Sequence, residues 1–118
     1  MTESNTEPDL LLGRHCRPLK GIESALPAPA IDTCLTQVPG WRLTDDRHAI
    51  RKEFRFADYF HTIAFVNAVA SIAHREDHHP DLVVGSDHCG VTWSTHSAGG
   101  LTRNDYICAA RTGALVDA

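Results

Sequence analysis

The chain has 118 residues, of which 42% are hydrophobic and 22% charged, and this length and composition are typical of one globular domain. The net charge of −4 and the lack of a basic cluster argue against binding to nucleic acid or to a membrane surface. No apolar run approaches the roughly 20 residues that span a bilayer, and the acidic start is unlike a signal or transit peptide, so we expect a cytoplasmic protein.

The composition of the N-terminal quarter of the chain predicts an arm rather than part of the folded domain. We expect residues 1–27 to form a flexible N-terminal arm, and residues 28–118 to form the domain. Residues 1–9 are polar and lack periodicity, which predicts disorder. Residues 10–24 mix apolar and basic side chains with glycine and proline, which predicts an extended segment that lies on the domain.

Within the domain, hydrophobic periodicity predicts three helices and four strands. Apolar residues at helical spacing predict a first helix over 31–38, followed by a strand pair at 41–44 and 49–56 in which Ile50, Phe54 and Phe56 share one face. The longest helix covers about 58–77 and is apolar on two faces, so we expect its second face to meet another helix or another subunit. A second hairpin follows at 81–86 and 90–95, and a final helix starts at Thr102, with Asp105 completing a capping box.

The element order is therefore α-β-β-α-β-β-α. This order predicts an α+β fold with a single four-stranded antiparallel sheet and three helices on one face.

The stretch HREDHHPDL, residues 74–82, carries the densest cluster of chemically active side chains. His74 and His78 have the i, i+4 spacing of a zinc-binding helix, but Arg75 replaces the glutamate of that motif and Pro80 ends the helix, so we expect no metal. Alternatively, imidazoles near neutral pH act as acid and base, and hairpin geometry brings the end of this cluster close to His96. A third interpretation is that these histidines only cap a helix end, and the spacing alone leaves the last two open.

A family resemblance narrows these alternatives. The sequence HHP at 78–80, the sequence THSAGGLTRND at 95–105 and the sequence PGW at 39–41 together resemble the pterin-4a-carbinolamine dehydratase family, over residues 31–115. The resemblance implies the fold predicted above, in dimers or tetramers. It also implies removal of water from a 4a-hydroxytetrahydropterin without a metal or another cofactor. In this chain it assigns general acid/base roles to His78, His79 and His96, and substrate-binding roles to Asp77, Pro80, Ser86 and Asp105.

Ser86 departs from the family pattern, because the family usually has an aromatic residue there. A serine removes an apolar wall that would help to shape a pterin pocket. A narrower resemblance, which includes the arm sequence RHCRPLKG at 14–21, is to dehydratase-like proteins of α-carboxysome operons that assist Rubisco assembly.

Two hypotheses follow from these resemblances. The favoured one is a non-catalytic or weakly catalytic assembly factor: a homodimer of a bacterial cytoplasm, associated with the carboxysome, whose partners are Rubisco subunits. The alternative is an active dehydratase that binds a pterin and uses its histidines for catalysis.

Overall fold

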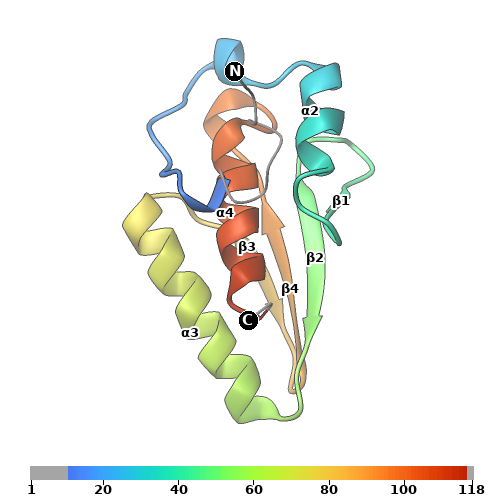
Figure 1. Cartoon of the computed structure of the whole chain (residues 1–118), viewed down its shortest axis with the longest axis vertical. Coiled ribbons are helices and arrows are strands. Elements are labelled where there is room, and N and C mark those ends of the chain that lie inside the picture. The colour runs from blue at the N-terminus through green and yellow to red at the C-terminus, as the bar shows by residue number, and fades with distance from the viewer. Residues whose placement is uncertain (1–10, 117–118) are drawn as a thin grey trace.

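The elements follow the predicted order in the computed structural model, which describes residues 11–116 (Figure 1). The disorder predicted for residues 1–9 lies outside the described residues. The elements are a short 3-10 helix η1 (Ile22–Ser24), α2 (Ala28–Leu35), β1 (Arg42–Leu43), β2 (Ile50–Arg55), α3 (Tyr59–Glu76), β3 (Asp81–Val84), β4 (His88–Trp93), a second 3-10 helix η2 (His96–Ala98) and α4 (Arg103–Ala114).

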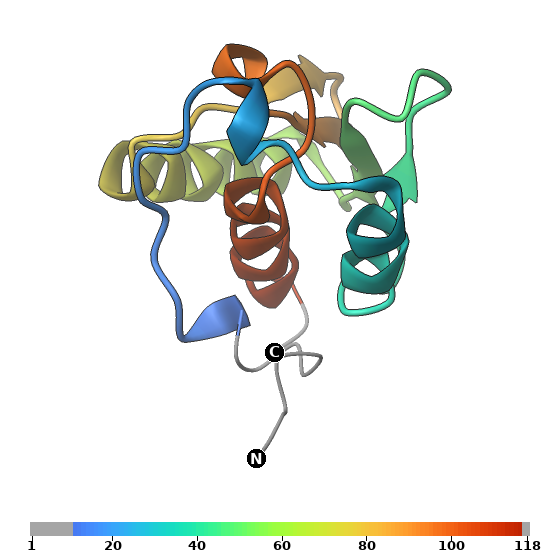
Figure 2. The same cartoon turned by 90° about the horizontal axis from the view of Figure 1, so that it is seen from above.

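The four strands form one antiparallel sheet in the order β1-β2-β4-β3. In this sheet Ile50 of β2 lies opposite Trp93 of β4, and Leu82 of β3 lies opposite Val91. Helices α2, α3 and α4 all lie on the same side of the sheet, as the two perpendicular views show (Figures 1 and 2). The predicted α+β fold, with three helices on one face, is confirmed.

The core lies between the sheet and the helices, and strand alternation explains which side chains reach it. Ile50, Val91 and Trp93 are fully buried, and Phe54 is 4% exposed. Lys52 breaks the apolar alternation of β2, and its ammonium lies 5.1 Å from the centre of the Phe54 ring, so its charge remains at the edge of the core.

Several element boundaries differ from the sequence-based prediction, among them the starts of α2 and β4. Helix α2 begins at Ala28, three residues earlier than predicted, because Pro27 is its N-cap and Pro29 suits the first turn, where no backbone N–H is needed. Strand β4 begins at His88 rather than at Gly90, because the fully buried Cys89 pairs with Phe54 and Val84. The turn between β3 and β4 is therefore 85–87.

Helix α3 is buried along one face. Its N-cap Asp58 accepts a hydrogen bond from the His61 backbone at 2.8 Å. Phe65, Val69 and Ile72 face the core. The second apolar stripe is only partly covered within one chain, since Val66 is half-buried and Ala70 is exposed.

The arm residues 11–27 run past the C-terminal end of α3 and along α4 (Figure 2). Backbone hydrogen bonds tie the arm to the loop around η2: Gly21 donates to Ser97 and Leu26 donates to Leu101, both at 2.9 Å. Within residues 11–116, no helix combines the length and the apolar character needed to cross a membrane.

Candidate functional site

The HHP segment is positioned by the way in which α3 ends. Asp77 adopts the left-handed conformation, with φ of 52°, and the His78 backbone N–H donates to the Ala73 carbonyl at 3.1 Å. This is the hydrogen-bond pattern of a Schellman C-cap, although glycine is the usual residue at the left-handed position. Pro80 cannot continue a helix, and β3 begins at the next residue. The chain therefore reverses sharply, which directs the His78 side chain back toward α4.

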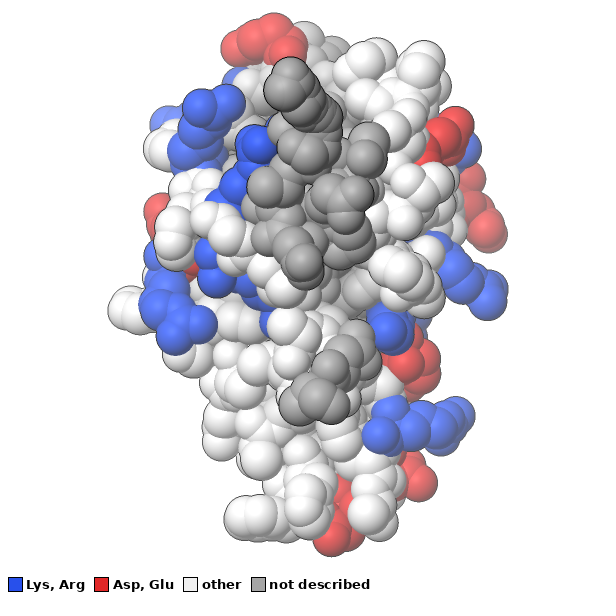
Figure 3. All heavy atoms as spheres, in the orientation of Figure 1, with Lys and Arg blue, Asp and Glu red and all other residues white. Residues whose placement is uncertain are grey.

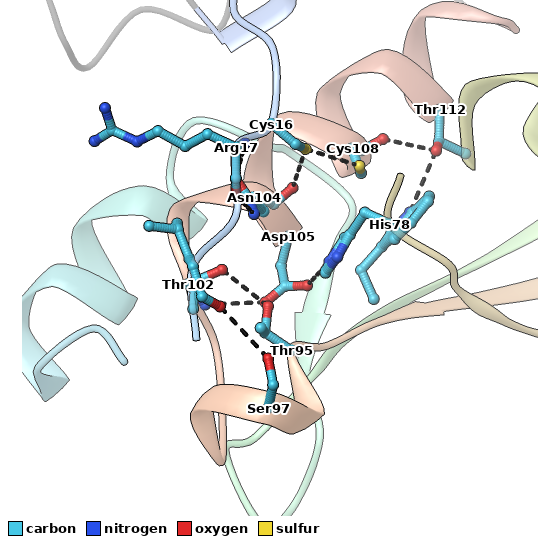
Figure 4. A network of polar contacts seen from close by, with 12 residues as sticks. Cys16, Arg17, His78, Thr95, Ser97, Thr102, Asn104, Asp105, Cys108 and Thr112 are labelled. Atoms are coloured by element: carbon cyan, nitrogen blue, oxygen red, sulfur yellow. Dashed lines mark hydrogen bonds and ion pairs between the residues drawn. The ribbon is translucent and has the colours of Figure 1, made fainter. Parts of the chain in front are cut away.

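His78 meets a buried carboxylate on α4. Its Nε2 lies 2.6 Å from Oδ1 of Asp105, with the histidine side chain 12% exposed and the aspartate fully buried. The other carboxylate oxygen, Oδ2, accepts hydrogen bonds from the Thr95 hydroxyl at 2.8 Å and from the Thr102 backbone N–H at 2.9 Å (Figure 4). Asp105 therefore caps α4, as the sequence predicts, and also holds His78.

The imidazole ring of His78 is also held from one face by Trp93. The two rings are stacked, with centroids 5.6 Å apart and planes 9° from parallel. Trp93 is itself fully buried, and its indole N–H donates to the Thr112 hydroxyl at 3.3 Å. The orientation of the His78 ring is therefore fixed by two contacts: Asp105 holds Nε2 at the ring edge, and Trp93 packs against the ring face.

This pairing has a chemical consequence for the imidazole. An ionised carboxylate only accepts hydrogen bonds, so the short contact with Asp105 places a proton on Nε2 of His78. Neutral His78 then has its free lone pair on Nδ1, and this nitrogen can take up a proton. The arrangement thus provides one oriented base, held by a buried acid.

Two hollows share Thr95 in their linings. The first, of about 340 Å³, is bordered by His78 and by the arm. The second, of about 370 Å³, is bordered by His96. The first is lined by Cys16, Arg17, Pro18, Leu19, Lys20, Arg75, Glu76, Asp77, His78, Thr95, Ser97 and Asn104, and the second by Thr44, Asp46, His48, Ala49, Asp81, Thr92, Ser94, Thr95, His96 and Gly100.

The structure brings the three predicted histidines to one end of the sheet without joining them. Asp81 pairs with Thr92, so His79, just before β3, and His96, just after β4, lie at the same end. Both side chains are exposed, and His79 lines neither hollow. Among residues 11–116, no hydrogen bond or ring contact connects either of them to His78. Their acid/base roles stay predictions.

Ser86 lies away from this end of the sheet, and its substrate-binding role stays a prediction. It occupies the turn between β3 and β4, where its carbonyl accepts a hydrogen bond from Thr62, near the start of α3. The strand β3, Asp81–Val84, lies between this turn and the end with the histidines, and it spans roughly 10 Å at the rise of a strand. Within one chain, an aromatic side chain at this position could not line a pocket formed by the histidines.

Glu76 is a buried acid that sequence analysis missed. Its carboxylate accepts the Cys16 backbone N–H at 2.7 Å and contacts His15 Nδ1 at 2.8 Å. Burial alone would raise the pKa of Glu76, but these hydrogen bonds and the Arg111 guanidinium lower it overall. The arm is therefore fastened to the end of α3 by a charged group, and no local sequence pattern marks an acid in the last turn as a buried anchor.

The metal alternative finds no support in the described part of the chain. Between residues 11 and 116, no three His, Cys, Asp or Glu side chains lie together in a way that could hold a metal ion. His74, the residue that suggested the zinc motif, is exposed on α3.

The sequence model of the family described as pterin 4 alpha carbinolamine dehydratase matches residues 24–115. The chain belongs to this family. A relative from Xanthomonas oryzae pv. oryzae with the provisional name pterin-4-alpha-carbinolamine dehydratase is 55% identical over 103 residues, which is 87% of either chain. A relative from Xanthomonas campestris pv. campestris with the same name is 54% identical over the same share.

Two solved structures of the family share the fold. The transcriptional coactivator/pterin dehydratase from Brucella melitensis has a TM-score of 0.74 and 31% identity, covering 77% of this chain and 97% of that one. A pterin dehydratase-like protein identified as a RuBisCO assembly factor in the α-carboxysome has a TM-score of 0.58 and 26% identity, covering 67% of this chain and 92% of that one.

The presence of the arm does not distinguish relatives named as dehydratases from the relative identified as an assembly factor. An alignment that covers 103 of 118 residues must begin by residue 16, so the match to the Xanthomonas oryzae protein includes arm residues before the family match begins at residue 24. The arm is therefore shared with a relative named as a dehydratase. This removes the arm as evidence for an assembly factor.

Proposed function

We propose that this protein removes water from a 4a-hydroxytetrahydropterin by general acid/base catalysis. The observation that carries the proposal is the 2.6 Å contact between His78 and the buried Asp105, beside a hollow of about 340 Å³. Relatives at 54–55% identity carry the name of this activity. Two premises of the assembly-factor hypothesis are also weakened, since the arm is shared with such a relative and Ser86 lies far from the histidines.

The reaction needs two proton transfers. Loss of water takes the hydroxyl group from C4a and the proton from the neighbouring N5, and it leaves the quinonoid dihydropterin. Nδ1 of His78, oriented by Asp105, is the proposed base that takes the N5 proton. His96, in its protonated form, is the proposed acid that protonates the leaving hydroxyl. A ring system lying across Thr95 would meet His78 on one side and His96 on the other.

The pair could instead have a purely structural role, fastening the end of α3 to α4. The two interpretations differ in the effect of His78→Gln, because a glutamine amide can still donate to Asp105 but cannot act as a base. We expect this variant to remain folded and to lose at least 100-fold in the enzyme-catalysed rate of dehydration, within the range that general acid/base groups contribute.

The matched control is His61→Gln. His61 also pairs with an aspartate, at 2.7 Å from Asp58, but at the other end of α3 and fully outside both hollows. The measurement is the rate at which the purified full-length chain converts a 4a-hydroxytetrahydropterin above the spontaneous rate. Equal rates for His78→Gln and the unchanged protein would refute the proposed role of His78.

A second candidate is assistance in Rubisco assembly, with association with the carboxysome. The specific observation in its favour is the fold similarity to the α-carboxysome assembly factor, at 26% identity. The test is co-expression with Rubisco large and small subunits in a host that lacks other assembly factors. We expect more soluble assembled Rubisco if this function is correct, and an unchanged yield would count against it.

We also propose that the chain forms a homodimer, as the family resemblance implies. Three exposed features support this: Phe60 on α3 is 76% exposed, Val83 is 59% exposed, and β3 is an edge strand of the sheet. Light scattering on the eluting protein gives the mass directly. A mass near 13 kDa at micromolar concentration would contradict the proposal, because one chain has a mass of 12.9 kDa.

A further inference from the structure

Two thiols meet where the arm crosses α4. Sγ of Cys16 lies 3.5 Å from Sγ of Cys108, although the two residues are 92 positions apart in the sequence. Sγ of Cys16 also lies 3.6 Å from the carbonyl oxygen of Asn104, one turn earlier in α4 (Figure 4). Because a disulfide bond is about 2.05 Å long, the sulfurs would need to approach by roughly 1.5 Å to form one.

The chain holds the two cysteines in place without help from the thiols. The Cys16 backbone N–H donates to Glu76 at 2.7 Å. The Asn104 side chain then binds both backbone groups of Arg17: its carbonyl accepts the N–H at 3.3 Å, and its amide donates to the carbonyl at 2.7 Å. The backbone around Cys16 is therefore fixed from two helices, and Cys16 is presented to Cys108.

The two thiols differ in access and in reactivity. Cys16 is half-buried, so a small oxidant can reach it, whereas Cys108 is fully buried. The hydrogen bond with Cys16 and the burial raise the pKa of the Cys108 thiol. Cys34 and Cys89 are also buried, and no described residue offers either of them a neighbouring thiol. Cys16 is therefore the cysteine that reacts first.

We propose that Cys16 and Cys108 are the site of a reversible disulfide that fastens the arm to α4 beside the His78–Asp105 pair. The oxidant is a low-molecular-weight disulfide such as oxidised glutathione. The Cys16 thiolate attacks one of its sulfurs and releases one small thiol, which leaves a mixed disulfide. The Cys108 sulfur then attacks Sγ of Cys16, its proton passes to the departing sulfur, and the second small thiol is released. Two protein thiols are oxidised, and one small disulfide is reduced to two thiols.

The disulfide would act on the first hollow, because Cys16 and His78 line it together. In the reduced protein the arm wall of this hollow is held by non-covalent contacts alone, and these can open locally. The disulfide removes that freedom and fixes the access to Nδ1 of His78. This consequence for catalysis rests on the proposed function, whereas formation of the disulfide does not.

The experiment uses the purified full-length chain in mixtures of oxidised and reduced glutathione at pH 8. We expect two of the four thiols to disappear, and peptide mapping without reductant to find one cross-linked pair, containing Cys16 and Cys108. The Cys16→Ser variant should form no cross-link, whereas the matched control Cys34→Ser should form it normally. The linked protein should unfold roughly 10 °C higher, because the bridge closes a loop of about 90 residues.

A second measurement follows the arm itself. Trypsin cleaves after Lys20 in the arm, and we expect cleavage there to be at least several-fold slower in the oxidised protein than in the reduced protein. A stable glutathione adduct on Cys16 with no bond to Cys108 would overturn the proposal. So would pairing through Cys34 or Cys89, or four free thiols at every glutathione ratio. None of these results depends on dehydratase activity, which is assayed separately.

Discussion

Asp105→Asn tests the centre of the site, because one carboxylate makes three hydrogen bonds there. Oδ1 contacts His78 at 2.6 Å, and Oδ2 accepts from Thr95 and from the Thr102 backbone at 2.8 and 2.9 Å. An asparagine can keep the two Thr contacts with its carbonyl oxygen. Its amide then faces His78 and donates to Nε2, so the imidazole must carry its proton on Nδ1.

The expected effects on stability and on rate have different sizes. A hydrogen bond to a charged group contributes roughly 1 kcal/mol more than a neutral one, so three weakened bonds cost on the order of 2–3 kcal/mol of unfolding free energy. The protein should stay folded at 25 °C, since a typical domain has about 5–15 kcal/mol. The dehydration rate should fall by roughly 10²–10⁴-fold, because the nitrogen proposed to act as the base is now protonated.

Two assays on the same preparation separate these effects. Urea unfolding, followed by tryptophan fluorescence, gives the loss of stability, and initial rates with a 4a-hydroxytetrahydropterin give the loss of activity. The matched control is Asp58→Asn, which alters the exposed pair of Asp58 with His61 at the start of α3. A stability loss of the expected size with a rate within twofold of the unchanged protein would refute the argument, because the pair would then be structural only.

Three further variants test other contacts. Tyr106→Phe should cost about 1–3 kcal/mol in urea unfolding, because the tyrosine hydroxyl donates to the Ile31 carbonyl at 2.9 Å inside the core; a cost below 0.3 kcal/mol would contradict this. Glu76→Gln should flatten the pH dependence of stability on the acid side. Folding lowers the pKa of Glu76, so its carboxylate stabilises the folded state above about pH 4.5, and this stabilisation is lost as pH falls through the folded-state pKa. Parallel stability curves for the two proteins below pH 5 would exclude that role. Ser86→Tyr should leave the dehydration rate of the purified protein unchanged, and a several-fold increase would show that this turn reaches the site.

The parts that the sequence could predict are those set by local rules. The capping box at Thr102 and Asp105 follows from three-residue spacing, and the inward faces of β2 and β4 follow from strand alternation. The position of Ser86 could also have been predicted, because a residue in a hairpin turn lies at the opposite end from the outer ends of both strands. The substrate-binding role of Ser86 was inferred from the family resemblance, which does not depend on the place of this residue in the hairpin.

The remaining features depend on contacts between distant segments. His78 and Asp105 are 27 positions apart, and Glu76 and Cys16 are 60 apart. No periodicity connects such pairs, because each is set by where two helix ends meet after packing. The buried charge of Glu76 is an example: a glutamate in a last helical turn is ordinarily exposed, and only the arm that folds over it makes it an anchor.

The two proposed functions place different demands on the same residues. Dehydration depends on a proton leaving or reaching Nδ1 of His78, so His78→Gln removes the dehydration activity even when the fold is intact. Binding of a large protein client depends on the outer surface, and His78 is only 12% exposed. The same variant should therefore assist Rubisco assembly as well as the unchanged protein does, if assembly is the function. Measuring both activities of His78→Gln separates the two functions, because a loss of one with retention of the other cannot arise from unfolding.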